Sequence, residues 1–150
     1  MKEIPHQAVF TAHLQAIYPV VITRQLPDCQ RFYTSWFGMQ TVFESSWYIM
    51  LSTGGKQPFT LAFMHEQHPS SPPSPAAFSG QGSFLTLQVA DARLVYEAMK
   101  KAGLTITYPL KDEPWGQRRF GLLDPNDMWI DVVEQIEPAP GFWDRYPTEK

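Results

Sequence analysis

The first half of the chain alternates short apolar runs with an amphipathic stretch, a pattern that predicts one strand, one helix and then three strands. Residues 18–23 form an apolar run rich in β-branched side chains and predict a strand. Residues 26–37 predict a helix, because Pro27 suits its first turn and Gly38 suits the left-handed position just past its end. Three further strands are predicted at 39–44, 47–53 and 59–65.

The second half repeats this order. Residues 84–89 predict a strand, and residues 91–102 predict a helix that Asp91 caps and Gly103 ends. The strand at 84–89 alternates apolar and more polar positions, so one of its faces would pack on the helix and the other would line something else. Three further strands are predicted at 104–110, 117–123 and 128–135. Each half therefore predicts the order β-α-β-β-β.

A segment rich in proline and serine separates the two halves and lacks the periodicity of a packed element. The tail after the last strand is also rich in proline. Its aromatic residues favour packing against the domain, and the alternative is a position across a groove or a partner subunit. We predict a single domain over residues 1–150. Its parts are a first repeat at about 17–66, a linker at about 67–82, a second repeat at about 83–136 and a C-terminal tail at 137–150.

Composition agrees with one folded domain and excludes several classes of partner. Hydrophobic residues make up 43% and charged residues 18% of the chain, and the net charge of -3 is not gathered into blocks. Because phosphate recognition needs clustered lysine and arginine, we expect no nucleic-acid partner. No apolar stretch approaches the ~20 residues of a membrane span, so we expect no membrane partner. The single cysteine, Cys29, cannot form an internal disulfide, and we expect a cytoplasmic protein.

Four short motifs extend this pattern into a family resemblance. They read Gln-Arg-Phe-Tyr at 30–33, Trp-Phe-Gly-Met at 36–39, Pro-Trp-Gly-Gln-Arg-Arg-Phe at 114–120 and Asp-Pro-Asn-Asp-Met-Trp-Ile-Asp at 124–131. In this order, and within the duplicated β-α-β-β-β pattern, they resemble the vicinal oxygen chelate superfamily over residues 17–136. That superfamily includes glyoxalases, extradiol dioxygenases and bleomycin-resistance proteins. The resemblance implies an α+β fold in which two βαβββ repeats form an open, curled mixed β-sheet barrel around a cleft, commonly completed by dimerisation.

The resemblance also implies where a divalent metal would be held. Enzymes of the family place ligands, usually His, Glu or Gln, on the first and last strands of each repeat. Those positions correspond here to Tyr18, Ala62, Phe84 and Asp131, and of the four side chains Asp131 alone is a good metal ligand. Because a metal site needs three or four converging donors, we expect no metal and no other cofactor.

The cleft that remains would be aromatic, apolar and weakly acidic, since 14% of the residues are aromatic. Arg118 and Arg119 are adjacent on a predicted strand, so one guanidinium would enter the cleft and the other would be solvated. The guanidinium in the cleft could pair with Asp131 or with a ligand carboxylate, and the alternative is a structural salt bridge. Packing in the core is the alternative for each aromatic candidate. The predicted ligand-binding residues are Tyr18, Trp47, Tyr48, Met50, Ala62, Phe84, Trp115, Arg118, Trp129 and Asp131.

Three functions are compatible with this reading. The first is a metal-free small-molecule binding protein that forms a homodimer and sequesters an aromatic or cationic compound, as the resemblance to antibiotic-binding bleomycin-resistance proteins implies. The second is an enzyme, a lyase, isomerase or dioxygenase with non-standard metal ligands, or one that uses Asp131 as a general base. The third is a role in subunit interaction, in which the tail and linker contact another protein.

Overall fold

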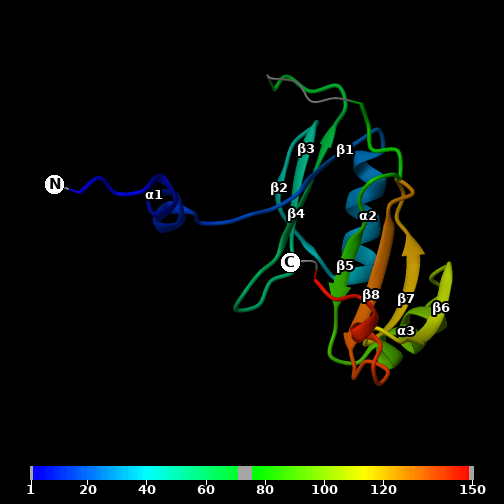
Figure 1. Ribbon diagram of the computed structural model, residues 1–150. Coiled ribbons are helices and arrows are strands. Elements are labelled where there is room, and N and C mark those ends of the chain that lie inside the picture. The colour runs from blue at the N-terminus through cyan, green and yellow to red at the C-terminus, as the bar shows by residue number, and fades with distance from the viewer. Residues whose placement is uncertain (1, 71–75, 149–150) are drawn as a thin grey trace.

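The computed structural model describes residues 2–70 and 76–148, and these form an α+β fold (Figure 1). Within the described residues the fold has three α-helices and two mixed sheets of four strands each. This architecture confirms the predicted fold class of two βαβββ repeats. The two sheets stay separate and do not close into a barrel within the described part of the chain.

The first repeat builds one sheet with the strand order β1-β4-β3-β2, in which β1 runs parallel to β4 and the other pairs are antiparallel. Helix α2 packs on one face of this sheet. A separate short helix, α1, precedes the repeat. The elements are α1 at His6–His13, β1 at Val20–Thr23, α2 at Leu26–Phe37, β2 at Gln40–Glu44, β3 at Tyr48–Ser52 and β4 at Thr60–His65.

The second repeat has the same topology, with the strand order β5-β8-β7-β6 and a parallel pair between β5 and β8. Helix α3 packs on one face of this sheet, and a short 3-10 helix follows in the tail. The equal strand orders confirm the duplication. The elements are β5 at Leu85–Gln88, α3 at Ala92–Lys101, β6 at Tyr108–Glu113, β7 at Gln117–Leu123, β8 at Trp129–Gln135 and η1 at Trp143–Arg145.

Local signals at the helix ends behave as the sequence predicts. The Asp91 carboxylate accepts a hydrogen bond from the backbone N–H of Leu94 at 3.0 Å and so caps α3. Gly38 ends α2 in the left-handed conformation, with φ 66°. The prediction of a strand at 104–110 is wrong in its bounds, because Leu104 packs in the core outside any strand and β6 begins four residues later.

One hydrophobic core spans both repeats. It contains Tyr33 of α2 and Phe63 of β4 from the first repeat, whose ring centroids lie 5.2 Å apart, and Phe120 and Ile130 from the second repeat. All four side chains are nearly or fully buried. Buried side chains of the two repeats therefore belong to one contiguous cluster.

A buried polar cluster joins the two repeats where the β7–β8 turn meets α2. The Thr23 hydroxyl donates to the side-chain oxygen of Asn126 at 2.6 Å, and the Asn126 side-chain N–H donates to the Cys29 sulfur at 3.2 Å. Burial is the main cause that raises the pKa of the Cys29 thiol. A buried thiol held in its neutral form is a poor nucleophile, so Cys29 has a structural role.

The same turn carries a second link to α2. The Tyr33 hydroxyl donates to Asp124 Oδ2 at 2.8 Å, while Asp124 Oδ1 accepts from the backbone N–H groups of Asn126 and Met128. Burial, followed by the charge of Asp124, raises the pKa of Tyr33 well above its usual range. A neutral phenol and a carboxylate that accepts three hydrogen bonds therefore hold the turn in place.

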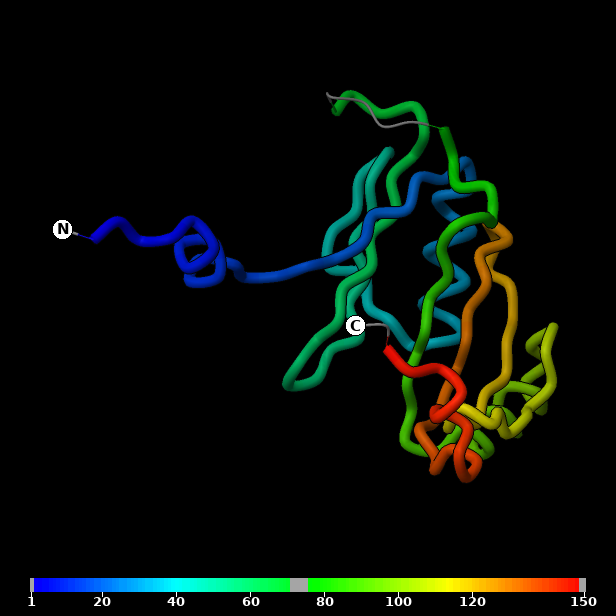
Figure 2. Tube along the Cα trace, in the orientation of Figure 1, coloured from blue at the N-terminus to red at the C-terminus, as the bar shows by residue number. Residues whose placement is uncertain are grey.

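The two ends of the chain behave differently. The N-terminal segment that contains α1 forms an arm that leaves the body, with α1 standing clear of both sheets and Phe10 64% exposed (Figure 2). The arm ends at Pro19, whose carbonyl accepts a hydrogen bond from the backbone N–H of Ala62 at 3.1 Å. The tail instead folds back onto the β6–β7 turn, where the Trp143 indole N–H donates to the carbonyl of Trp115 at 3.0 Å. This outcome agrees with the prediction that the tail packs against the domain. None of the helices described in residues 2–70 and 76–148 is long and apolar enough to cross a membrane.

Candidate ligand-binding site

Strands β7 and β8 gather polar and aromatic side chains on the face of the second sheet that points away from α3. Phe120 contacts Tyr96 of α3, with ring centroids 5.3 Å apart, so its neighbours Arg119 and Gly121 point to the opposite face. Gly121 lies directly across from Asp131 in the antiparallel pair and therefore shares that face. We call this surface the second-sheet face.

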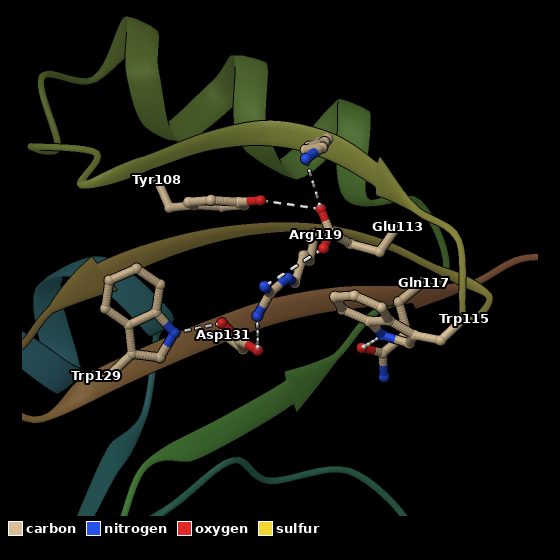
Figure 3. A network of polar contacts seen from close by, with 8 residues as sticks. Tyr108, Glu113, Trp115, Gln117, Arg119, Trp129 and Asp131 are labelled. Atoms are coloured by element: carbon tan, nitrogen blue, oxygen red, sulfur yellow. Dashed lines mark hydrogen bonds and ion pairs between the residues drawn. The ribbon is translucent and has the colours of Figure 1, made fainter. Parts of the chain in front are cut away.

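Asp131 is the centre of a polar network on the second-sheet face (Figure 3). Its Oδ2 accepts a hydrogen bond from Arg119 Nη1 at 3.0 Å, and its Oδ1 accepts one from the indole N–H of Trp129. The residue is 4% exposed. Both carboxylate oxygens are thus engaged by donors from the protein itself, which is what allows a carboxylate to be buried.

Arg119 bridges two carboxylates and lies between two aromatic rings. Its Nη2 is 3.5 Å from Glu113 Oε2, in addition to the bond to Asp131. The guanidinium carbon lies 4.9 Å from the ring centroid of Tyr108 and 5.1 Å from that of Trp115, so both rings make cation–π contacts with it. Burial works against the charge, but the hydrogen bond and the attraction of Asp131 and Glu113 raise the pKa of Arg119 above its ordinary value.

Glu113 is the second carboxylate of the network, and it too is bonded to donors from the protein. Its Oε1 accepts a hydrogen bond from the Tyr108 hydroxyl at 2.9 Å and lies 3.7 Å from the Lys111 ammonium. The side chain of Glu113 is 5% exposed, whereas that of Lys111 is 63% exposed. Two positive and two negative side chains therefore balance each other at this site.

A glycine gives the Trp129 ring its position. A Cβ built on Gly121 would lie 2.7 Å from the Cε2 and Cη2 atoms of Trp129, and closer still to Cζ2. The indole therefore rests directly on the backbone of β7, and its N–H reaches the carboxylate of Asp131. Only glycine leaves room for this arrangement.

One buried N–H donor of the network has no hydrogen-bond partner in the described part of the chain. Among the residues that the structure describes, Arg119 Nε is the buried side-chain nitrogen or oxygen without a hydrogen-bond partner. The other two nitrogens of the same guanidinium are both engaged by carboxylates, and the guanidinium carbon lies over the rings of Tyr108 and Trp115. The aromatic contacts compensate in part for a bond that the geometry does not supply.

The sequence-predicted residues of the second repeat do not all join this network. Trp115, Trp129 and Asp131 belong to it. Phe84 precedes β5 and is 58% exposed. Arg118 points to the α3 side of β7, where it pairs with Asp112 at 2.7 Å and with Glu134 at 3.6 Å. Of the two adjacent arginines it is therefore Arg119, not Arg118, that pairs with Asp131, and a binding role of Arg118 stays a prediction.

The predicted residues of the first repeat form a separate group on the first sheet. Met50 and Ala62 lie directly across from each other in the β3–β4 pair, and Ala62 is fully buried. Tyr18 is 42% exposed, and Trp47 contacts Tyr48 with ring centroids 6.0 Å apart. Burial, then the neighbouring Tyr18 phenol, raises the pKa of Tyr48. We call this apolar surface the first-sheet face.

The structure brings the candidates together within each sheet but does not join the two groups. Across residues 2–70 and 76–148, no side-chain hydrogen bond, ion pair or aromatic contact links the first-sheet face to the second-sheet face. Several members of the network were not predicted as site residues. They are Tyr108, Lys111, Glu113, Gln117 and Gly121, together with Arg119, which strand alternation left as one of two alternatives for the arginine that enters the cleft.

The positions that would hold a metal do not fit one. Tyr18, Ala62 and Phe84 offer no carboxylate, imidazole or thiolate, and both oxygens of Asp131 are bonded to Arg119 and Trp129. In the part of the chain that the structure describes, no group of three or more His, Cys, Asp or Glu side chains could hold an ion. The chemistry of this face is therefore that of aromatic stacking and ion pairs.

The fold and this face define a class: a duplicated βαβββ protein whose second sheet carries a charge-balanced, aromatic side-chain network. A family model described as Glyoxalase/Bleomycin resistance protein/Dioxygenase superfamily matches residues 11–132. The chain therefore belongs to this superfamily. No curated protein matches the sequence.

Solved structures have the same fold at low sequence identity. A glyoxalase/bleomycin resistance protein/dioxygenase from Nocardioides superposes with a TM-score of 0.64 at 18% identity, covering 91% of this chain and 97% of that one. Lactoylglutathione lyase from Agrobacterium tumefaciens gives 0.64 at 16% identity, over 80% and 92% of the two chains. A virulence protein from Salmonella typhimurium gives 0.64 at 16% identity, over 82% and 98%. Similarity at these identities is evidence for the fold alone.

Proposed function

We propose that this member of the superfamily is a small-molecule binding protein that uses aromatic and polar side chains rather than a metal to hold an aromatic or cationic compound. The observation that carries the proposal is the state of Asp131. The one carboxylate at a metal-ligand position is bonded to Arg119 and Trp129, and the other three positions are Tyr18, Ala62 and Phe84.

Aromatic side chains around the network support the proposal. Trp115, Trp129 and Tyr108 lie around one buried polar network, and this combination of ring surface and a few fixed polar groups is typical of small-molecule sites. A planar ligand would stack on an indole ring, while the polar atoms at the rim would orient it.

A second copy of the chain is the partner that we propose. The described chain exposes large apolar side chains in both repeats, including Tyr18 at 42%, Phe43 at 54% and Phe84 at 58%. Exposed apolar surface on this scale favours association. A homodimer would cover it and would place a second wall near each ligand-binding face. Molar mass from light scattering, measured over a range of concentrations, tests this proposal, and a mass equal to one chain at all of them contradicts it.

The binding function is tested on the full chain purified without chelator. We expect less than stoichiometric nickel, zinc, iron and manganese by elemental analysis. We also expect saturable quenching of tryptophan fluorescence by one of two planar probes, 1-naphthol or N-methylquinolinium. Trp129→Phe should weaken the binding of the probe because it removes part of the ring and the N–H to Asp131.

Trp36→Phe is the matched control, since this indole packs against the hydrophobic core from α2 and lies outside the network. It should leave probe affinity unchanged. Stoichiometric metal in the purified protein would contradict the proposal and favour a metal-dependent enzyme of the superfamily. Equal effects of the two tryptophan substitutions would place the binding site elsewhere.

A further inference from the structure

The contacts of Arg119 bear on the charge of the ligand. We propose that Arg119 is a specificity-determining residue that makes the second-sheet face select uncharged planar aromatic molecules over aromatic cations and anions. This inference rests on the proposed binding function and narrows its ligand class.

A cationic ligand needs an anionic partner, and the two carboxylates of the face are already paired. Asp131 accepts from Arg119 and Trp129, and Glu113 accepts from Tyr108 and faces both Arg119 and Lys111. The side chains of Asp131 and Glu113 are only 6% and 5% exposed. A ligand cation would gain a partner here only by displacing Arg119, which would leave that guanidinium partly buried and unpaired.

The aromatic rings lead to the same conclusion. Cations bind to ring faces, but Arg119 itself occupies the faces of Tyr108 and Trp115 that point into the network, at 4.9 Å and 5.1 Å. A second cation at these rings would meet a like charge. The protein therefore supplies its own cation in the place that a cationic ligand would take.

An anionic ligand has no advantage either. Arg119 is attractive to it, but Asp131 and Glu113 lie on either side of that guanidinium at 3.0 Å and 3.5 Å and repel it. The indole of Trp129 packs against Gly121 and is partly exposed, and its N–H is already bonded to Asp131. Partly exposed ring surface of this kind favours stacking by an uncharged ring.

Three probes of nearly equal shape and different charge test the inference: 2-naphthamide, 2-naphthoate and 2-naphthylmethylammonium. Their affinities are measured by isothermal titration calorimetry on the full chain at low ionic strength, where electrostatic selectivity is least screened. For the unaltered protein we expect 2-naphthamide to bind tightest.

Two variants change the charge of the site in opposite directions. Arg119→Gln leaves Asp131 and Glu113 without their shared cation, so the affinity for the ammonium relative to the amide should rise about tenfold. Asp131→Asn frees Arg119 from one carboxylate, so the affinity for the carboxylate relative to the amide should rise by a similar factor, about tenfold. The control is Arg31→Gln, which removes an exposed arginine paired with Asp28 on α2 and should leave all three ratios unchanged.

The outcomes distinguish a failure of the proposed selectivity from a failure of the proposed small-molecule binding function. Tightest binding of the ammonium by the unaltered protein, or unchanged ratios in both variants, would overturn the role of Arg119 while the binding function stands. Binding of none of the three probes would overturn both. If Arg119→Gln does not fold, Asp131→Asn alone decides, because this substitution is isosteric. A general loss of affinity would leave the ratio of carboxylate to amide affinity unchanged, whereas the inference predicts that this ratio rises.

Discussion

Replacing Gly121 by alanine is the smallest change that would disturb the second-sheet face. The backbone of Gly121 does not require glycine, because its φ lies outside the left-handed region. The added methyl group instead collides with the Trp129 ring, 2.7 Å from two of its atoms. The indole must swing away from the sheet, and its hydrogen bond to Asp131 is then lost.

Two contributions set the size of the effect. Forcing a methyl group into a packed site typically costs about 1–3 kcal/mol. A hydrogen bond to a charged group contributes about 1.5–3 kcal/mol when it is buried. Trp129 is partly exposed, so its ring can move toward solvent and relieve part of the overlap. We therefore expect Gly121→Ala to lower the free energy of unfolding by about 2 kcal/mol, near the middle of these ranges.

A double-mutant cycle with Trp129→Ala isolates this contact. Urea unfolding followed by circular dichroism gives the free energy for the parent, the two single variants and the double variant. Once the indole is gone, Gly121→Ala should be neutral or slightly stabilising, because alanine loses less backbone entropy in a strand than glycine does. The expected coupling energy between positions 121 and 129 is about 2 kcal/mol.

An equal loss of stability from Gly121→Ala in both backgrounds would contradict this prediction. A constant cost would mean that the methyl group disturbs the sheet itself and that the ring is not held against Gly121. The near-ultraviolet circular dichroism spectrum is an independent check, since release of Trp129 from a fixed position weakens its signal while the far-ultraviolet spectrum stays unchanged.

Three further predictions concern the link between the repeats and the tail. Asn126→Ala leaves a buried hydroxyl and thiol without their shared partner, so urea unfolding should show a loss of about 1–3 kcal/mol. The buried phenol of Tyr33 has a raised pKa, so its contribution to stability is complete below pH ~10 and declines above it as the unfolded chain ionises. Tyr33→Phe should flatten this alkaline decline and, at neutral pH, cost stability because Asp124 loses a donor. Trp143→Phe removes the N–H that holds the Trp115 carbonyl, so limited proteolysis should cut the tail sooner, with less than about 1 kcal/mol lost in urea unfolding.

Much of the fold could be predicted because its signals are local. Pro27, Gly38 and Asp91 mark helix ends through their own backbone or capping chemistry, and period-two alternation identified the strands. The start of β6 was predicted four residues too early, since Leu104 is apolar whether it lies in a strand or, as here, in a loop that packs in the core. Helix α1 was not predicted, and it makes no buried contact in the described residues that would leave a pattern in the sequence.

The site was harder to predict because its ion pairs and ring contacts join side chains of different strands. The alternation rule correctly separates Arg118 from Arg119, but it does not say which of them faces Asp131. That choice depends on the β7–β8 register, in which Arg119 lies across from Val133 and Gly121 across from Asp131. Counting along both strands from the short turn at 124–127 would have given this register, and it is the signal that sequence reasoning missed.

The register also explains why an arginine can hold Asp131. Arg119 and Asp131 are diagonal neighbours on adjacent strands, a separation of roughly 7–8 Å between backbones that only a long side chain spans. The aspartate position that the superfamily resemblance implies for a metal ligand is thus held by a cation that is part of the chain. Because Arg119 also bridges Glu113 and makes cation–π contacts with two rings, removing it would disturb the packing of four side chains, those of Asp131, Glu113, Tyr108 and Trp115. Adding metal ligands at Ala62 and Phe84 would therefore not recreate a metal site while Arg119 remains, since Asp131 would still be committed to its guanidinium.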